Sequence, residues 1–196
     1  MGTTNKVKFG IKNCHYAVAT IAANGTATYG TVKALPGAVS LSMDAQGDLS
    51  PFYADDIEYY VDNQNNGYSG TLELALIPDN FKKDVLGYQE DTNGVMYEDG
   101  NAPVVHFALL FEFSGDKHAK RHVMYNCVSG RPAVSGSTKT TTAEPQTESL
   151  SITSTSVYNA DVQKYIPKAS CTPTETGQYN GWMSTVYQPT ATAATT

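Results

Sequence analysis

The sequence lacks a long hydrophobic run. No apolar stretch in its 196 residues approaches the roughly 18 residues that a membrane-spanning helix needs. The N-terminal stretch MGTTNKVKFG also lacks the apolar core of a secretory signal. We therefore expect a soluble protein that is made in the cytoplasm and has no membrane partner.

Cysteine is scarce as well. Cys14, Cys127 and Cys171 are odd in number and irregularly spaced. A disulfide-stapled secreted domain would carry an even set, so we expect reduced thiols in a reducing compartment. The fold must then be stabilised by a hydrophobic core rather than by disulfides. The chain is long enough to form one domain with such a core.

Motifs that carry catalysis are missing. The chain has no Gly-x-Ser-x-Gly elbow, no phosphate-cradling glycine loop and no dinucleotide fingerprint. Asp55, Asp56 and Glu58 are neighbouring acids in a polar stretch, which is typical of a solvated surface rather than of a catalytic pair from separate strands. We therefore expect no enzymatic activity and no cofactor.

Two spacings resemble metal sites without completing them. His118 and His122 are four residues apart, but they lie on a turn and a strand rather than on one helix face. Residues 62–73 match several positions of a calcium loop, yet no helices flank them and Ser69 replaces an aliphatic residue. A hairpin turn at Asn66-Gly67 is the favoured interpretation, and no metal is predicted.

Positive charge is scarce in the middle of the chain. Residues 1–43 hold four lysines and no acid, whereas residues 44–99 hold 13 acids against only Lys82 and Lys83. The formal net charge is −6. A domain that reads DNA sequence would carry a basic face, so this distribution argues against one and indicates a surface that repels polyanions.

The sequence is rich in turns between alternating strands. Asn-Gly occurs at 24–25, 66–67 and 93–94 between strand-like runs, which predicts β-hairpins. Residues 106–113 and 121–129 predict a further hairpin. Alternation predicts a core face for three strands, formed by Val39, Leu41 and Met43, by Leu72, Leu74 and Leu76, and by Phe107, Leu109, Phe111 and Phe113. The pattern predicts a mostly antiparallel β protein.

One helix is predicted, over residues 79–87, with Asp79 as its N-cap and Gly87 at its end. The stretch 147–157 is rich in Thr and Ser, which is typical of an edge strand or of a strand that pairs with another chain. From residue 159 onward the sequence shows no strong hydrophobic periodicity of a helix or a strand. Residues 159–196 are therefore interpreted as a C-terminal arm with a short aromatic anchor at 178–187, which contains Trp182 and Tyr187.

Several of these stretches together resemble a known family. The run GAVSLSMDAQGDLSPFYADDIEYYVDNQNNGYSGTLELALIPDNF, followed by FALLFEF, RHVMYNCVSGRP and QTESLSIT, is similar to the major tail proteins of long-tailed, non-contractile bacteriophages, which form the tail tube. The similarity runs through most of residues 6–157 and extends weakly to NGWMSTVY. It rests on a long colinear match, and it suggests a tail-tube domain over residues 1–158.

The resemblance implies a fold and a role. The fold would be a β-sandwich or partial barrel with one helix, a long loop and terminal arms, completed to a β-barrel when subunits associate. The subunits would form hexameric rings that stack into a tube, through which DNA leaves the capsid. Partners would be copies of this chain and the tape measure, tail terminator and distal tail proteins. The protein would reside in the virion tail after synthesis in the bacterial cytoplasm.

Two sets of residues are candidate sites under this hypothesis. The acidic, tyrosine-rich loop 44–68 would reach another ring, because aromatic rings with polar tips offer large contact areas. Its candidate contact residues are Phe52, Tyr53, Asp55, Asp56, Tyr59 and Tyr60. Carboxylates on the wall of the bore would repel phosphate, and Glu73 and Glu112, on the polar sides of predicted strands, are the candidate lumen residues.

A second hypothesis stays open. A free-standing β-sandwich binding module, such as an adhesin domain, would also explain the strands and the exposed tyrosines. Such a module usually has an export signal and a sugar or peptide cleft, and the sequence shows neither. A metal-dependent hydrolase is a more remote alternative.

Overall fold

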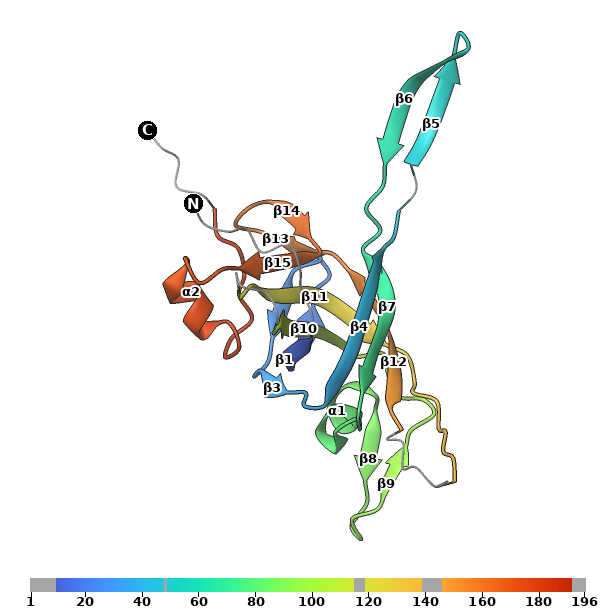
Figure 1. Ribbon diagram of the computed structural model, residues 1–196, viewed down its shortest axis with the longest axis vertical. Helices are drawn as coiled ribbons and strands as arrows, with labels where there is room; N and C mark the ends of the chain where they lie inside the picture. Colours follow the sequence, from blue (N-terminus) through green and yellow to red (C-terminus); the bar gives the residue numbers. More distant parts are fainter. Residues whose placement is uncertain (1–9, 48, 115–118, 139–145, 192–196) are drawn as a thin grey trace.

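The body of the protein is built on one antiparallel sheet, as the computed structural model in Figure 1 shows. The structure describes residues 10–47, 49–114, 119–138 and 146–191. The strand order is β2-β1-β10-β11-β12-β7-β4, with β3 paired to β1 and β15 paired to β11. These strands are β1 (Ile11–Ile21), β2 (Ala27–Tyr29), β3 (Lys33–Ala34), β4 (Ala38–Ala45), β7 (Tyr68–Leu74), β10 (His106–Phe113), β11 (Arg121–Ser129), β12 (Glu148–Thr155) and β15 (Lys168–Cys171). The prediction of a mainly β fold is confirmed.

Three two-stranded ladders extend from this body. They are β5 (Leu49–Ala54) with β6 (Ile57–Asn63), β8 (Tyr88–Glu90) with β9 (Met96–Glu98), and β13 (Val157–Asn159) with β14 (Lys164–Ile166). The first ladder, here called the distal hairpin (residues 49–63), projects far beyond the body at one end of the long axis (Figure 1). The β8–β9 ladder lies at the opposite end. Asn24-Gly25 and Asn93-Gly94 join paired strands, as predicted.

The main sheet curls around a first core cluster, and over the described residues it does not close into a barrel. Both ends of the sheet contribute to this cluster, together with helix α1 (Asp79–Val85). The ring of Phe81 packs edge-on against the rings of Tyr16 and Phe107, with centroid distances of 4.9 and 5.5 Å. The helix therefore plugs the concave side of the sheet, and edge-to-face contacts add to the stabilisation by apolar burial.

The ends of α1 differ in how well the sequence predicts them. Pro78, not Asp79, is the N-cap residue, and no side chain caps the helix, so the predicted N-cap is wrong. Asp79 is the first helical residue. The positive end of the helix dipole stabilises its carboxylate at this position. Gly87 has a φ of 77° just beyond the end, the left-handed conformation that favours glycine and stops a helix.

The C-terminal part of the chain covers the other face of the sheet over β1, β10 and β11. A second core cluster forms there between these strands, β13 and the segment that includes α2 (Thr176–Gly181). Trp182 is only 2% exposed, stacks on Tyr187 at a centroid distance of 5.3 Å and donates from Nε1 to the His122 carbonyl at 3.4 Å. The sequence did not predict β14, β15 or α2, because each spans too few residues to show a period.

Two predicted core positions are exposed instead. Val39 is 51% exposed, because the pairing of β4 with β7 shifts register between Ala38 and Ser40 and breaks the alternation there. Leu76 is 65% exposed, because β7 ends at Leu74 and Ile77 takes the next buried position. Both errors arise because the alternation of buried and exposed residues was assumed to continue where the strand is irregular or has ended.

Candidate assembly surfaces

The part of the sheet that the C-terminal segment leaves bare carries short polar side chains. β12 lies between β11 and β7, so the prediction of an edge strand at 147–157 is wrong. Leu150 and Ile152 face the first core cluster, and alternation turns the intervening Ser and Thr residues to solvent. β7 and β4 continue the same pattern beside it.

We call this surface the hydroxyl face. It consists of three cross-strand rows, which are Ser149, Glu73 and Ser40, then Ser151, Thr71 and Ser42, and then Thr153, Ser69 and Asp44. Each side chain is exposed or half-buried, and none of them is cationic. The hydroxyl of Ser40 donates to the Glu73 carboxylate at 2.6 Å, which holds that acid within the row. The face is therefore polar, short-chained and free of positive charge.

Glu73 and Glu112, the two predicted lumen residues, lie in different environments. Glu73 belongs to the hydroxyl face, whereas Glu112 is only 5% exposed and pairs with Arg121 at 3.0 Å. Arg121 also donates to the Tyr179 carbonyl at 2.6 Å and lies 4.0 Å from the centroid of that tyrosine ring. The polar side of β10 is thus covered by the C-terminal segment, so of the two predicted lumen residues only Glu73, which is half-buried, lies on an uncovered surface.

The predicted loop 44–68 contains a β-hairpin. Its turn is Asp55-Asp56, with φ values of 52° and 59°, and a two-residue type I′ turn requires positive φ at both positions. The predicted turn at Asn66-Gly67 is wrong. Gly67 lies where the chain returns from β6 to β7, and a Cβ there would come within 2.1 Å of the Ser154 carbonyl oxygen, so only glycine fits.

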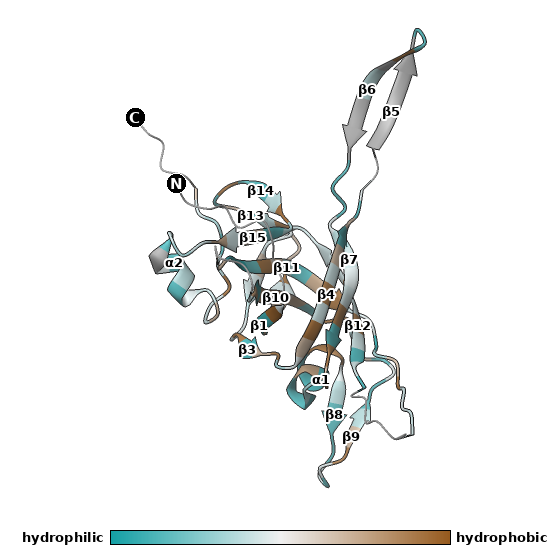
Figure 2. Ribbon diagram, in the orientation of Figure 1, coloured by the Kyte–Doolittle hydropathy of each residue, from teal (hydrophilic) through white to brown (hydrophobic). Residues whose placement is uncertain are grey.

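The described side chains of the distal hairpin are directed to solvent. Asp55 and Asp56 are exposed, and the turn that they form is hydrophilic in Figure 2. Beside them Ile57, Tyr59 and Tyr60 are 60%, 71% and 61% exposed. Phe52 and Tyr53 lie on β5, but their side chains fall outside the described residues. Large apolar side chains exposed together on a projecting hairpin are typical of a contact surface.

The sheet also has an open edge. Among the described strands β4 pairs only with β7, so its outer backbone edge has no strand partner, and the opposite end of the sheet finishes in the short strands β2 and β3. An unpaired edge is a template for a strand from another chain.

The described residues contain no group of three or more His, Cys, Asp or Glu side chains that could hold a metal ion. Burial raises the pKa of the Cys14 and Cys127 thiols to about 12 each, so both stay protonated and unreactive at neutral pH. Within the described ranges no helix has the length and apolar character to cross a membrane.

A bare polar face, an open edge and a projecting hairpin have the character of a structural subunit. A family model described as phage tail tube protein matches residues 2–163, and the chain belongs to this family of structural proteins of the virion tail. One chain of a cryo-EM structure of the anti-feeding prophage baseplate, symmetrised six-fold, is similar at 8% identity and a TM-score of 0.43, with 87% of this chain and 98% of that chain covered. No curated protein matched.

Proposed function

We propose that this protein assembles into stacked hexameric rings and forms the tail tube of a long-tailed, non-contractile phage, through which DNA is ejected into the host. The observation that carries the proposal is the hydroxyl face, which combines hydroxyls and the carboxylates of Glu73 and Asp44 without a cation. Proteins hold DNA chiefly through lysine and arginine contacts that release counterions. A bore lined with the hydroxyl face would let DNA pass without adhering.

The open sheet supplies a means of closure. Copies that add the β4 edge to the far end of a neighbouring sheet would continue one sheet around a ring and complete the barrel that a single chain leaves open. The hydroxyl face would form the inner wall of that barrel. The distal hairpin, which continues from β4 and β7, would extend to the next ring of the stack (Figure 1).

Other partners of the proposed tube are proteins that occupy it or cap it. These would be the tape measure, tail terminator and distal tail proteins. Binding to them would require no catalytic site in this chain. Membership of a structural family indicates a role without catalysis.

Electron microscopy of the purified protein tests the assembly. We expect rings or tubes in negative stain, and sedimentation should show large species whose share grows with protein concentration, because association follows mass action. A monomer at every concentration that binds a sugar or peptide would instead support a free-standing binding module. Absence of the protein from purified tails would also contradict the proposal.

The lumen role predicts a charge effect at Glu73. In virions that carry Glu73→Lys, each ring presents new ammonium groups to the DNA, and we expect ejection to slow by about tenfold or more at low salt. Added salt should reverse the slowing, because it screens phosphate contacts. Fluorescence of a DNA-binding dye after triggered ejection measures the rate.

The matched control for this experiment is Asp161→Lys. Asp161 is an exposed acid between β13 and β14, in the part of the chain that covers the opposite face of the sheet, so its reversal should leave ejection unchanged. Normal tails with unchanged ejection in the Glu73→Lys virions would show that Glu73 does not face the bore.

A further inference from the structure

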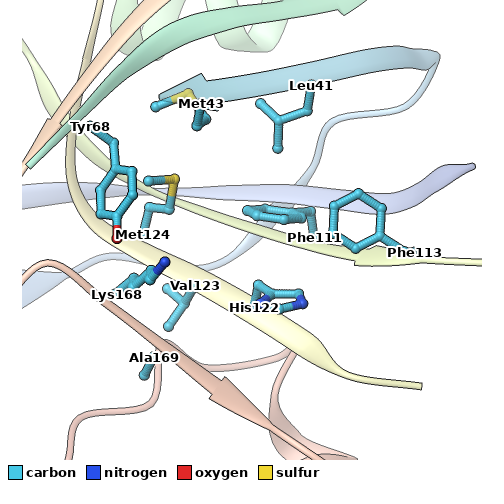
Figure 3. A pocket seen from close by; sticks show the side chains of 10 residues that line it. All are labelled: Leu41, Met43, Tyr68, Phe111, Phe113, His122, Val123, Met124, Lys168 and Ala169. Carbon is cyan, nitrogen blue, oxygen red and sulfur yellow. The ribbon is translucent and has the colours of Figure 1, made fainter. Parts of the chain in front are cut away.

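A cavity of about 200 Å³ opens where the main sheet splits. β11 pairs with β15 through residues 121–124 and with β12 through residues 126–129, so its two partner strands diverge along one edge. Leu41 and Met43 of β4 face Phe111 across the resulting gap (Figure 3). Pockets for small-molecule ligands occupy about 300–1,000 Å³, so this cavity is better matched to one side chain of a protein partner.

The cavity is apolar inside and cationic at its rim. The rings of Phe111 and Phe113 pack edge to face at 5.7 Å, and His122 stacks on Phe111 at 5.2 Å. The ammonium of Lys168 lies 4.4 Å from the centroid of the Tyr68 ring, and Lys168 takes part in none of the ion pairs among the described residues. A complementary partner would carry an apolar side chain next to a carboxylate.

The tip of the distal hairpin carries this combination. Asp55 and Asp56 directly precede Ile57, and all three are exposed. Tyr60 lies on the same face of the hairpin as Ile57, because their cross-strand partners are two residues apart on β5. The tip therefore presents apolar surface beside two negative charges, and none of the residues that the structure describes buries it.

The β8–β9 ladder, which also exposes apolar side chains, is a poorer receiver for this tip. Val95 and Tyr97 are exposed there, but the acids Glu90, Asp91, Glu98 and Asp99 belong to the same stretch of chain. Like charges placed opposite one another in an interface cost several kcal/mol. The hairpin also leads away from its own body, so the cavity that receives it belongs to another copy (Figure 1).

We propose that the distal hairpin of one copy docks in this cavity on a second copy, with Ile57 inside it, Tyr60 at its mouth and Asp55 and Asp56 paired with Lys168. The inference rests on the proposed assembly into rings and adds the receiving site and the chemistry of its partner. Burial of Ile57 in the cavity would provide affinity. The pairing of Lys168 with Asp55 and Asp56 would provide specificity, because a neighbour in another position would leave these charges unpaired.

A double-mutant cycle on the full-length protein tests the charge pairing. Lys168→Glu should raise the protein concentration needed for tube formation by about tenfold or more, because it places three carboxylates together. Asp55→Asn with Asp56→Asn keeps residues that tolerate the positive φ of the turn. In that background Lys168→Glu should change the concentration by less than about threefold. Lys164→Glu, an exposed lysine on β14, is the control and should have no effect.

Cysteine cross-linking tests the contact itself. A mixture of Ile57→Cys and Met43→Cys proteins should yield covalently joined pairs of chains with a short bis-maleimide, whereas Tyr97→Cys with Met43→Cys should not. If the wild type forms tubes but the cycle shows no coupling and no cross-link appears, docking in this cavity is overturned while assembly stands. If the wild type stays monomeric, both the assembly and the docking are overturned.

Discussion

Replacement of Trp182 by alanine is expected to lower the free energy of unfolding by about 3–5 kcal/mol. The indole is 2% exposed, and its loss removes the stacking on Tyr187, the hydrogen bond to the His122 carbonyl and the filling of the second core cluster. Denaturant unfolding of the unassembled protein, followed by circular dichroism, measures the change.

The control for Trp182 is Val134→Ala. Val134 is fully exposed, so its truncation should change the stability by less than about 0.5 kcal/mol. A loss below about 1 kcal/mol for Trp182→Ala would mean that the C-terminal segment does not stabilise the sheet in solution.

Replacement of Arg121 by alanine is expected to cost about 3–5 kcal/mol, because it leaves the carboxylate of Glu112 buried without its main partner. The Glu112 side chain is 7% exposed, and the remaining cation, Lys12, is itself 52% exposed at 3.5 Å. The substitution also removes the contacts of the guanidinium with Tyr179. Thermal and denaturant unfolding of the same unassembled preparation measure the loss.

Arg131→Ala is the matched comparison for Arg121→Ala. Arg131 forms an ion pair of similar length with Glu98, but the two side chains are 63% and 36% exposed, so its loss should cost about 0–1 kcal/mol. Adding Glu112→Gln to Arg121→Ala should recover part of the stability, because it removes the orphaned charge. Equal losses for the two arginines would show that burial of Glu112 does not decide the effect.

Elements with strong local patterns were predictable from the sequence. The strands 106–113 and 121–129 have the predicted bounds, because dense apolar residues on both sides of a short polar connection specify a buried hairpin. The helix spans 79–85 of the predicted 79–87. Glu73 was predictable as a polar-side residue, because β7 alternates without interruption up to Leu74.

Features that depend on distant partners were not predictable. The composition of 147–157 is that of an edge strand, but the positions of β11 and β7 make it interior. The distal hairpin was expected as a loop, because its turn uses Asp55-Asp56 rather than the Asn-Gly that usually marks a type I′ turn. Glu112 alternates as a solvent residue, but it lies on the side of β10 that the C-terminal segment covers and is 5% exposed.

The two edges of the main sheet are unlike, with β4 at one end and β2 and β3 at the other. Copies that join the β4 edge of one to the β2–β3 end of the next associate head to tail rather than about a two-fold axis, so a closed ring of them would have two different faces. Every distal hairpin then leaves from the same face. In the proposed assembly a stack of these rings would be a polar filament, in which one terminus offers hairpins and the other offers empty cavities. Its growth would have a direction, and the capsid-proximal and host-proximal ends of such a tail would require chemically different caps.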